Sequence, residues 1–186
     1  MRPNPNKPMK STILGLATLL CCSCYGQQWM TRNGNVDFFS ATFAENIEAK
    51  NEMASGILAT DGQFAFRVPI LGFRFEKALM EEHFNENYLE STKFPNGSFE
   101  GSIVNWNMEL NDGAWHEVVA RGELTIHGIA IPREIPSKIQ WNGEAWQIQS
   151  EFLIATADHE IPIPKMVRKK IAEEISVEVN LSLSPR

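Results

Sequence analysis

Apolar residues recur at every second position in several stretches of this 186-residue chain, and this alternation limits the possible fold more than any other feature. A period of two places one set of side chains on a buried face of a β-strand and the other set on a solvated face. The alternating sets are Phe64, Phe66, Val68 and Ile70; Val118, Ala120, Leu124 and Ile126; Trp146, Ile148, Phe152 and Ile154; and Ile175, Val177, Val179, Leu181 and Leu183. Each set predicts a half-buried antiparallel strand.

Turn-forming residues lie between these runs. Residues that tolerate positive φ occur at Asn33-Gly34, Asp61-Gly62, Asn111-Asp112-Gly113 and Asn142-Gly143. Each of these predicts a hairpin loop between consecutive strands. About eight or nine short strands with few helices are typical of a sandwich or a barrel. We expect an all-β fold with one or two short helices, arranged as an antiparallel β-barrel, because closure removes exposed strand edges.

One long segment departs from the strand pattern. Between Glu76 and Glu90, apolar residues fall at helical spacing and acidic residues stay on the other side. The stripe formed by Met80, Phe84 and Tyr88 predicts a helix that packs on the sheet.

A second short helix is expected from Pro164 to about Ala172, because proline suits the first turn of a helix. The segment contains Arg168, Lys169 and Lys170, which form a basic cluster in a mature chain that is acidic as a whole.

The first 26 residues have the organisation of a secretory signal. A basic start precedes an apolar run, Ile13 to Cys22, of about ten residues, which is too short to cross a bilayer. We therefore expect cleavage after Gly26, export, and a single mature domain over residues 27–186. All cysteines lie in this segment, so the mature domain is expected to form no disulfide. Lipid anchoring at Cys24 is disfavoured because the two residues Cys21 and Cys22 suit the preceding positions poorly.

The charge balance excludes some classes of partner. Loss of the signal removes Arg2, Lys7 and Lys10 and no acidic residue, so the net charge shifts from −6 to −9. Nucleic acids and anionic membranes both reward clustered positive charge. We therefore expect no nucleic-acid partner and at most transient contact with a membrane.

Four motifs follow one another in the region from Val36 to Leu183 and identify a family by their order. They are Phe73-x-Phe75; Leu79-Met80-x-x-His83-Phe84-Asn85-Glu86-Asn87-Tyr88-Leu89-Glu90-Ser91; Lys93-Phe94-Pro95, followed by Phe99; and Gly122-x-Leu124-Thr125-Ile126-His127-Gly128. Together they resemble the YceI-like family of lipid-binding proteins. The resemblance implies an extended, lipocalin-like barrel that holds a long isoprenoid or fatty-acyl chain in the bacterial periplasm. It implies no cofactor and no catalytic reaction.

This chain departs from the family pattern in the helix. Members commonly have an Arg-Asp-x-His-Leu type segment, and Glu81-Glu82-His83-Phe84-Asn85 stands here instead. Headgroup contacts that the family assigns to that arginine and aspartate therefore do not transfer to this chain.

Under this interpretation the inward apolar side chains contact the lipid tail. The expected lumen and mouth residues are Phe64, Phe66, Val68, Phe73, Met80, Phe84, Phe99, Leu124, Ile126, Trp146 and Phe152. The candidates for the headgroup or the mouth are His83, His127, Arg168, Lys169 and Lys170. Tail burial contributes about 0.8 kcal/mol per CH₂, so long tails are favoured over short ones, and the helix is a candidate lid.

Three alternatives remain open. The same apolar alternation fits a solid core, so the chain could be an interaction module with a filled barrel. A metal-binding protein or enzyme could use His83, His127 or His159 with nearby carboxylates, although the sequence contains neither a zinc-helix histidine pair nor a Gly-x-Ser-x-Gly elbow. A homodimer could form through an exposed strand.

Overall fold

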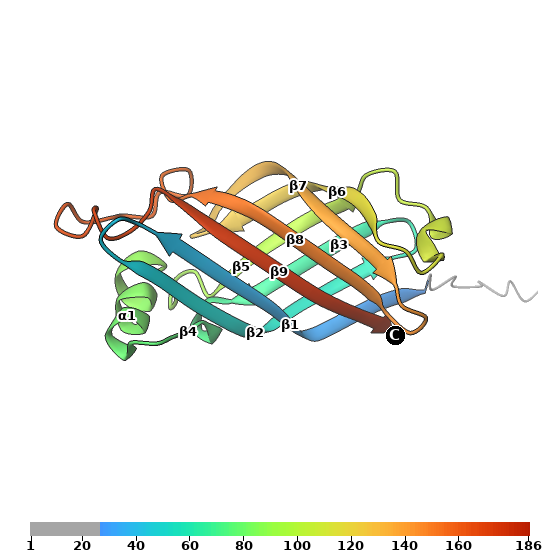
Figure 1. Cartoon of the computed structure of the whole chain (residues 1–186), viewed down its shortest axis with the longest axis horizontal. Coiled ribbons are helices and arrows are strands. Elements are labelled where there is room, and N and C mark those ends of the chain that lie inside the picture. Colours follow the sequence, from blue (N-terminus) through green and yellow to red (C-terminus); the bar gives the residue numbers. More distant parts are fainter. Residues whose placement is uncertain (1–26) are drawn as a thin grey trace, which may run out of the picture.

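The computed structural model describes residues 27–186 and shows an elongated antiparallel β-barrel (Figure 1). The strands are β1 (Gln28–Ala41), β2 (Asn46–Ala59), β3 (Gln63–Pro69), β4 (Arg74–Phe75), β5 (Asn96–Ile103), β6 (His116–Ile126), β7 (Ile129–Trp141), β8 (Trp146–Ala155) and β9 (Glu174–Pro185). They lie in the order β1-β9-β8-β7-β6-β5-β3-β2-β4, and an additional β1–β2 pairing closes the barrel. The expected all-β, lipocalin-like barrel is confirmed.

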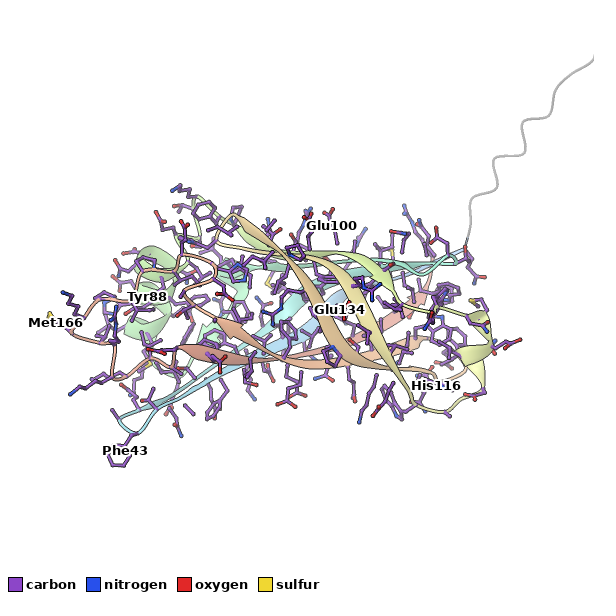
Figure 2. All side chains as sticks on the ribbon, turned by 90° about the horizontal axis from the view of Figure 1, so that it is seen from above. Phe43, Tyr88, Glu100, His116, Glu134 and Met166 are labelled. Carbon is purple, nitrogen blue, oxygen red and sulfur yellow. The ribbon has the colours of Figure 1, made fainter. Side chains whose placement is uncertain are left out.

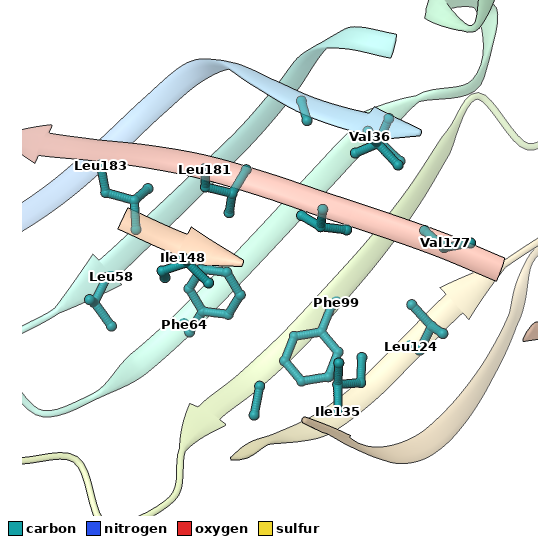
Figure 3. Close-up of a cluster of buried hydrophobic side chains, with 14 of the residues drawn as sticks. Val36, Leu58, Phe64, Phe99, Leu124, Ile135, Ile148, Val177, Leu181 and Leu183 are labelled. Atoms are coloured by element: carbon teal, nitrogen blue, oxygen red, sulfur yellow. The ribbon is translucent and has the colours of Figure 1, made fainter. Parts of the chain in front are cut away.

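The alternation seen in the sequence places the core. Inward residues of the long strands form the core, and β9 buries Val177, Val179, Leu181 and Leu183 at every second position. Figure 3 shows side chains of facing strands meeting inside the barrel, among them Phe64 of β3 and Ile148 of β8. The period of two is therefore a direct record of which face each strand turns inward.

Two of the expected hairpin turns are confirmed. The chain reverses at Asp61-Gly62 between β2 and β3, and at Asn142-Gly143 between β7 and β8. Gly62 and Gly143 have φ values of 85° and 97°, which favour glycine over residues with a side chain.

The hairpin expected at Asn33-Gly34 is wrong, because both residues lie inside β1. The pairing of β1 with β2 shifts register on either side of Gly34, which marks a bulge. A Cβ atom at Gly34 would collide with Cδ2 of Leu181 on β9. The glycine thus serves a close approach between strands instead of a turn.

The connection between β5 and β6 differs from a tight hairpin too. Residues 104–115 form a longer loop with a short 3₁₀ helix, η3 (Met108–Asn111), and Asn111-Asp112-Gly113 lies at its end. Instead, a two-residue turn at His127-Gly128 joins β6 to β7, with φ values of 51° and 77° and the pair Ile126–Ile129 on either side. Positive φ at both central residues is the mark of a type I′ turn.

A helical segment covers one end of the barrel and confirms the first expected helix with narrower bounds. It consists of α1 (Ala78–His83) and a π-helical turn, η2 (Phe84–Tyr88). It follows the 3₁₀ turn η1 (Ile70–Gly72) and the short strand β4. Figure 1 shows α1 at the end where β1 stops and β2 begins.

The second expected helix, from Pro164 to Ala172, is wrong. Residues 164–170 form successive turns, in which Val167 N donates to Pro164 O at 3.0 Å and Lys170 N donates to Val167 O at 2.8 Å. Pro162 and Pro164 favour extended backbone in the residues before them, which disfavours a helical approach. Val167 also turns toward the barrel interior, so tertiary contacts shape this loop.

The expected signal peptide, residues 1–26, and the candidate anchor Cys24 lie outside the described residues. From residue 27 onward, the structure contains no helix with the length and apolar character that a membrane span requires.

Candidate functional site

A cavity of about 480 Å³ lies inside the barrel under the α1–η2 segment. Strands β1, β2, β3, β5, β6, β8 and β9 contribute to its wall, and residues 161–171 complete it. The polar side chains on the wall are Ser40, Glu45, Lys77, His83, Tyr88, Ser98, Thr156 and Lys170. All other lining residues are apolar, so the cavity matches a hydrophobic guest and leaves polar groups only a minor role.

Aromatic rings form the wall next to the helix. The ring of Phe84 in η2 packs on three other rings. Its centroid lies 5.4 Å from that of Phe38 in β1, 5.5 Å from that of Phe73 just before β4, and 5.0 Å from that of Phe75 in β4. Phe38 also contacts Phe73 and Phe75 at 5.4 and 5.6 Å. These contacts hold the helix on the barrel by ring packing. Because each ring also lines the cavity, a guest would touch the same cluster that seats the helix.

The rim of the cavity carries an ion-pair cluster. Nζ of Lys77, just before α1, lies 3.0 Å from Oε1 of Glu45 in the β1–β2 loop. Nζ of Lys170 lies 3.7 Å from Oε2 of the same carboxylate. The hydrogen bond from Lys77, aided by the charge of Lys170, holds the pKa of Glu45 below its usual value. One carboxylate thus joins three segments that surround the mouth.

A second, much smaller cavity of about 50 Å³ lies deeper in the barrel. Phe66, Leu124, Phe152 and Val179 line both cavities, so the interior narrows with distance from the helix. The lumen is therefore wide under α1 and nearly filled farther in.

The structure separates the predicted lumen residues into three groups. On the main cavity lie Phe66, Val68, Phe73, Met80, Phe84, Leu124, Ile126 and Phe152. Phe64 and Phe99 line the small inner cavity. Trp146 lines neither cavity and is wholly buried. Contact with a ligand stays a prediction for all of them.

Trp146 belongs to a solid core at the end of the barrel opposite α1. Its ring centroid lies 6.2 Å from Trp29, 5.1 Å from Trp106 and 5.3 Å from Trp141. The sequence predicts that Trp146 lines the lumen, and this packing places it outside the linings of both cavities. The two interpretations of the apolar alternation, lumen and solid core, thus hold at different ends of one barrel.

Of the predicted headgroup and mouth residues, His83 and Lys170 lie on the cavity wall. Arg168 and Lys169 are exposed on the loop beside it. His127 lies in the β6–β7 turn, away from the cavity lining, and ties neighbouring loops together. Its Nδ1 lies 3.1 Å from the carbonyl oxygen of His159, and its Nε2 lies 2.9 Å from Oε2 of Glu90.

His159, named among the candidates for the metal-binding or enzyme alternative, is a buried residue in the loop after β8. Only 1% of its surface is exposed, and Nδ1 lies 3.2 Å from the carbonyl oxygen of Ile129. Burial lowers the pKa of the ring. In residues 27–186, no three His, Cys, Asp or Glu side chains come together in a group that could hold a metal ion. His159 therefore anchors the loop after β8 beneath the β6–β7 turn.

The sequence pattern missed some cavity residues. Phe38 and Val36 follow the period of two within β1 and could have been found by extending the alternation test to that strand. Glu45 and Lys77 have no local signal, because their pairing depends on how distant loops meet. The contribution of residues 161–171 depends in the same way on the tertiary fold.

Comparison with known proteins places this geometry in a group of related barrels. A family model described as a YceI-like domain matches residues 26–183. No curated protein matches the chain.

Solved structures share the fold at low sequence identity. A polyisoprenoid binding domain from Saccharophagus degradans, implicated in plant cell wall breakdown, has a TM-score of 0.74 and 13% identity, over 87% of this chain and 99% of that one. BcnA of Burkholderia cenocepacia has a TM-score of 0.67 and 15% identity, over 81% and 96%. The YCEI protein of Campylobacter jejuni has a TM-score of 0.57 and 11% identity, over 74% and 84%.

Proposed function

Since this chain belongs to the YceI-like domain family, we propose that it is a non-catalytic carrier that holds one long apolar lipid, of isoprenoid or fatty-acyl type, in the cavity beneath α1. The observation that carries the proposal is the apolar cavity of about 480 Å³. The name of the Saccharophagus degradans domain, a polyisoprenoid binding domain, agrees with a guest of this kind.

The size of the cavity suits a long tail. A water molecule takes about 30 Å³ in the liquid, and a methylene group is of similar size, so about 480 Å³ corresponds to about 16 chain carbons. Burial of about 16 carbons contributes about 13 kcal/mol. Association costs about 4 to 15 kcal/mol. A tail of about 16 carbons offsets most of that range, whereas a tail of about four carbons contributes about 3 kcal/mol and stays below the range.

The mechanism is reversible transfer of the tail out of water, with no bond made or broken. The α1–η2 segment covers the cavity and contributes Met80 and Phe84 to its wall. A methionine adapts its shape to irregular guests. Outward movement of this segment would uncover the lumen, and its return would bury the tail.

Solvent extraction tests the proposal. The purified protein is extracted with organic solvent and the extract is analysed by mass spectrometry; a co-purifying long-chain lipid is the expected result. The emptied protein is then offered saturated fatty acids of increasing length, and affinity should rise with length until the cavity is full. Absence of any extracted lipid, together with no uptake of added isoprenoids or fatty acids, would reject the proposal.

Two adjacent residues of β8 give a matched pair of variants. Ile154 is buried on the cavity wall, whereas Leu153 points outward and is 50% exposed. Ile154→Trp should occupy part of the cavity and shorten the longest tail that binds. Leu153→Trp adds the same bulk on the outer face and should leave the length limit unchanged. Equal length limits for both variants would place the guest elsewhere.

The proposal includes export. We infer that residues 1–26 act as the export signal and that the carrier works in the periplasm, as the basic start and short apolar run of this segment suggest. N-terminal sequencing of protein recovered from a periplasmic fraction should begin at Gln27. Recovery only from the cytoplasm with Met1 retained would contradict this part of the proposal.

A further inference from the structure

Two apolar side chains project into solvent at the end of the barrel where the cavity lies. Phe43 in the β1–β2 loop and Met166 in the β8–β9 loop have relative exposures of 110% and 94%. Figure 2 shows both at the same end of the molecule, at the tips of their loops. Exposed apolar side chains that gather at one end of a molecule, in contrast to ones scattered singly, mark an interaction surface.

These tips border the mouth of the cavity. Glu45 lines the cavity two residues after Phe43, and Val167 lines it directly after Met166. The contacts of Glu45 with Lys77 and Lys170 hold both loops and the start of α1 around the same opening. Leu79 of α1 adds a further apolar side chain at the rim, 60% exposed.

The loop that carries Met166 is also the basic part of an acidic chain. Lys165, Arg168, Lys169 and Lys170 are all exposed, and no acidic residue interrupts residues 165–170. The whole chain has 23 acidic and 17 basic residues. The mouth therefore combines apolar tips with a local reversal of charge, the two properties that favour binding at an anionic membrane surface.

We propose that the mouth of the barrel docks on an anionic phospholipid bilayer, with Phe43 and Met166 entering the interface and residues 165–170 contacting lipid phosphates. A second copy of the chain fits less well, because a symmetric pairing through this end would place the two basic loops against each other. Three exposed acidic residues on or beside the helical segment, Glu76, Glu82 and Glu86, oppose docking and keep it weak and reversible.

Docking in this orientation gives the proposed carrier a route for its cargo. The opening of the cavity would face the bilayer, so a tail could pass between the two apolar phases with little exposure to water. This benefit rests on the proposed function. Vesicle binding itself does not depend on the proposed function, because it can be measured with protein from which any lipid has been removed.

Vesicle flotation tests the proposal. Emptied protein is mixed with vesicles of phosphatidylcholine alone or with added phosphatidylglycerol. Binding is expected only with the anionic lipid and should fall as salt rises. Phe43→Ser and Met166→Ser should each lower the partition coefficient about tenfold, since each removes one inserted apolar side chain. All variants are compared with the same N-terminal residues, so a difference in vesicle binding between them measures the contribution of the substituted side chain.

A variant at the other end of the barrel is the matched control. Met108 lies in η3 of the β5–β6 loop and is 40% exposed. Figure 1 shows this loop at the end of the barrel opposite α1. Met108→Ser should leave vesicle binding unchanged. Because these side chains are exposed, thermal unfolding should hardly change in any variant.

The proposal would be overturned by no binding of the parent protein to anionic vesicles, by equal binding of the Phe43→Ser/Met166→Ser double variant, or by an equal loss of binding in Met108→Ser. A dimer that sedimentation equilibrium shows to dissociate on Phe43→Ser would also overturn it, in favour of self-association. If the protein fails to bind vesicles but a lipid is still found in the solvent extract, the docking proposal is rejected and the carrier function is kept. If the protein binds vesicles but neither contains nor takes up a lipid, the carrier function is rejected and the docking proposal is kept.

Discussion

Nζ of Lys77 lies 3.0 Å from Oε1 of Glu45, so the residue that precedes helix α1 is tied to the β1–β2 loop across the rim of the cavity. Lys170 reaches the same carboxylate from the β8–β9 loop at 3.7 Å. All three segments must separate somewhat before a long tail can pass. The cluster should therefore affect how fast a guest leaves more than how stable the fold is.

Glu45→Gln tests this relationship. The neutral amide keeps the size of the side chain and loses the attraction to both lysines, so release of a fluorescent fatty acid should speed up a few-fold, with little change in thermal unfolding. High salt should speed release from the parent protein and have less effect on the variant. Stopped-flow transfer to acceptor vesicles measures the rate. The exposed Glu48 on β2 supplies the control, Glu48→Gln, and equal rates in all three proteins would contradict the prediction.

His159 gives a prediction about pH. Burial lowers the pKa of its ring below 6.5, opposed by hydrogen bonding to the backbone of Ile129 and Ile126 and by the charge of Asp158, and Arg133 lowers it further. The folded state therefore binds a proton less readily than the unfolded state. Stability should be fully present above about pH 6.5 and should fall as the pH drops below that value toward the folded pKa, with a slope of at most about 1.4 kcal/mol per pH unit.

Urea unfolding across about pH 5 to 8 measures this contribution. His159→Gln removes the titrating ring, so the free energy of unfolding should be lower at neutral pH but should vary less with pH than in the parent protein. Gln149 on β8 is exposed and does not titrate, so Gln149→Ala should keep the parent slope. A variant at position 159 with an unchanged slope would show that other groups cause the pH dependence.

Much of the fold follows from the sequence because burial acts on each strand separately. The alternation in β9 predicts its inward face correctly, since every second residue from Val177 to Leu183 meets the same core. The failures occur where one local pattern suits two environments. Asn33-Gly34 reads as a turn, but Gly34 accommodates a bulge beside Leu181.

The site is less predictable than the fold for a similar reason. Phe152 and Trp146 belong to one alternating run of β8, yet Phe152 lines the cavity and Trp146 packs in solid core. Only their position along the barrel axis separates them, and alternation carries no information about that axis. The rim cluster around Glu45 joins residues from three loops, so no local spacing could reveal it.

Gly101 and Gly122 give a prediction about the barrel wall. The two residues lie opposite each other in the β5–β6 pairing. A Cβ atom at Gly101 would lie 2.6 Å from Cα of Gly122, and a Cβ atom at Gly122 would lie 2.7 Å from Cα of Gly101. Backbone cannot yield as a side chain does, so Gly122→Ala should lower the free energy of unfolding by about 1 to 3 kcal/mol.

Chemical denaturation measures that loss, and Ser102→Ala on the neighbouring strand β5 is the matched control, with an expected change within about 0.5 kcal/mol. If Gly122→Ala were as stable as the control, the two strands would have to approach less closely than the structure shows.

Trp146 and Phe84 separate stability from binding. Trp146 is wholly buried among Trp29, Trp106 and Trp141, so Trp146→Ala should lower the free energy of unfolding by about 3 to 5 kcal/mol. It lines no part of the main cavity, so the folded fraction should bind a fluorescent fatty acid with nearly the parent affinity.

Phe84→Ala should affect binding more than stability, because this half-buried ring forms part of the cavity wall and packs the helix on the barrel. Its affinity should fall about tenfold, equal to about 1.4 kcal/mol, with a smaller loss of stability. Denaturation and ligand titration on the same samples measure the two effects. If the barrel had a solid core throughout, both substitutions would lower stability and neither would change the affinity for the fatty acid.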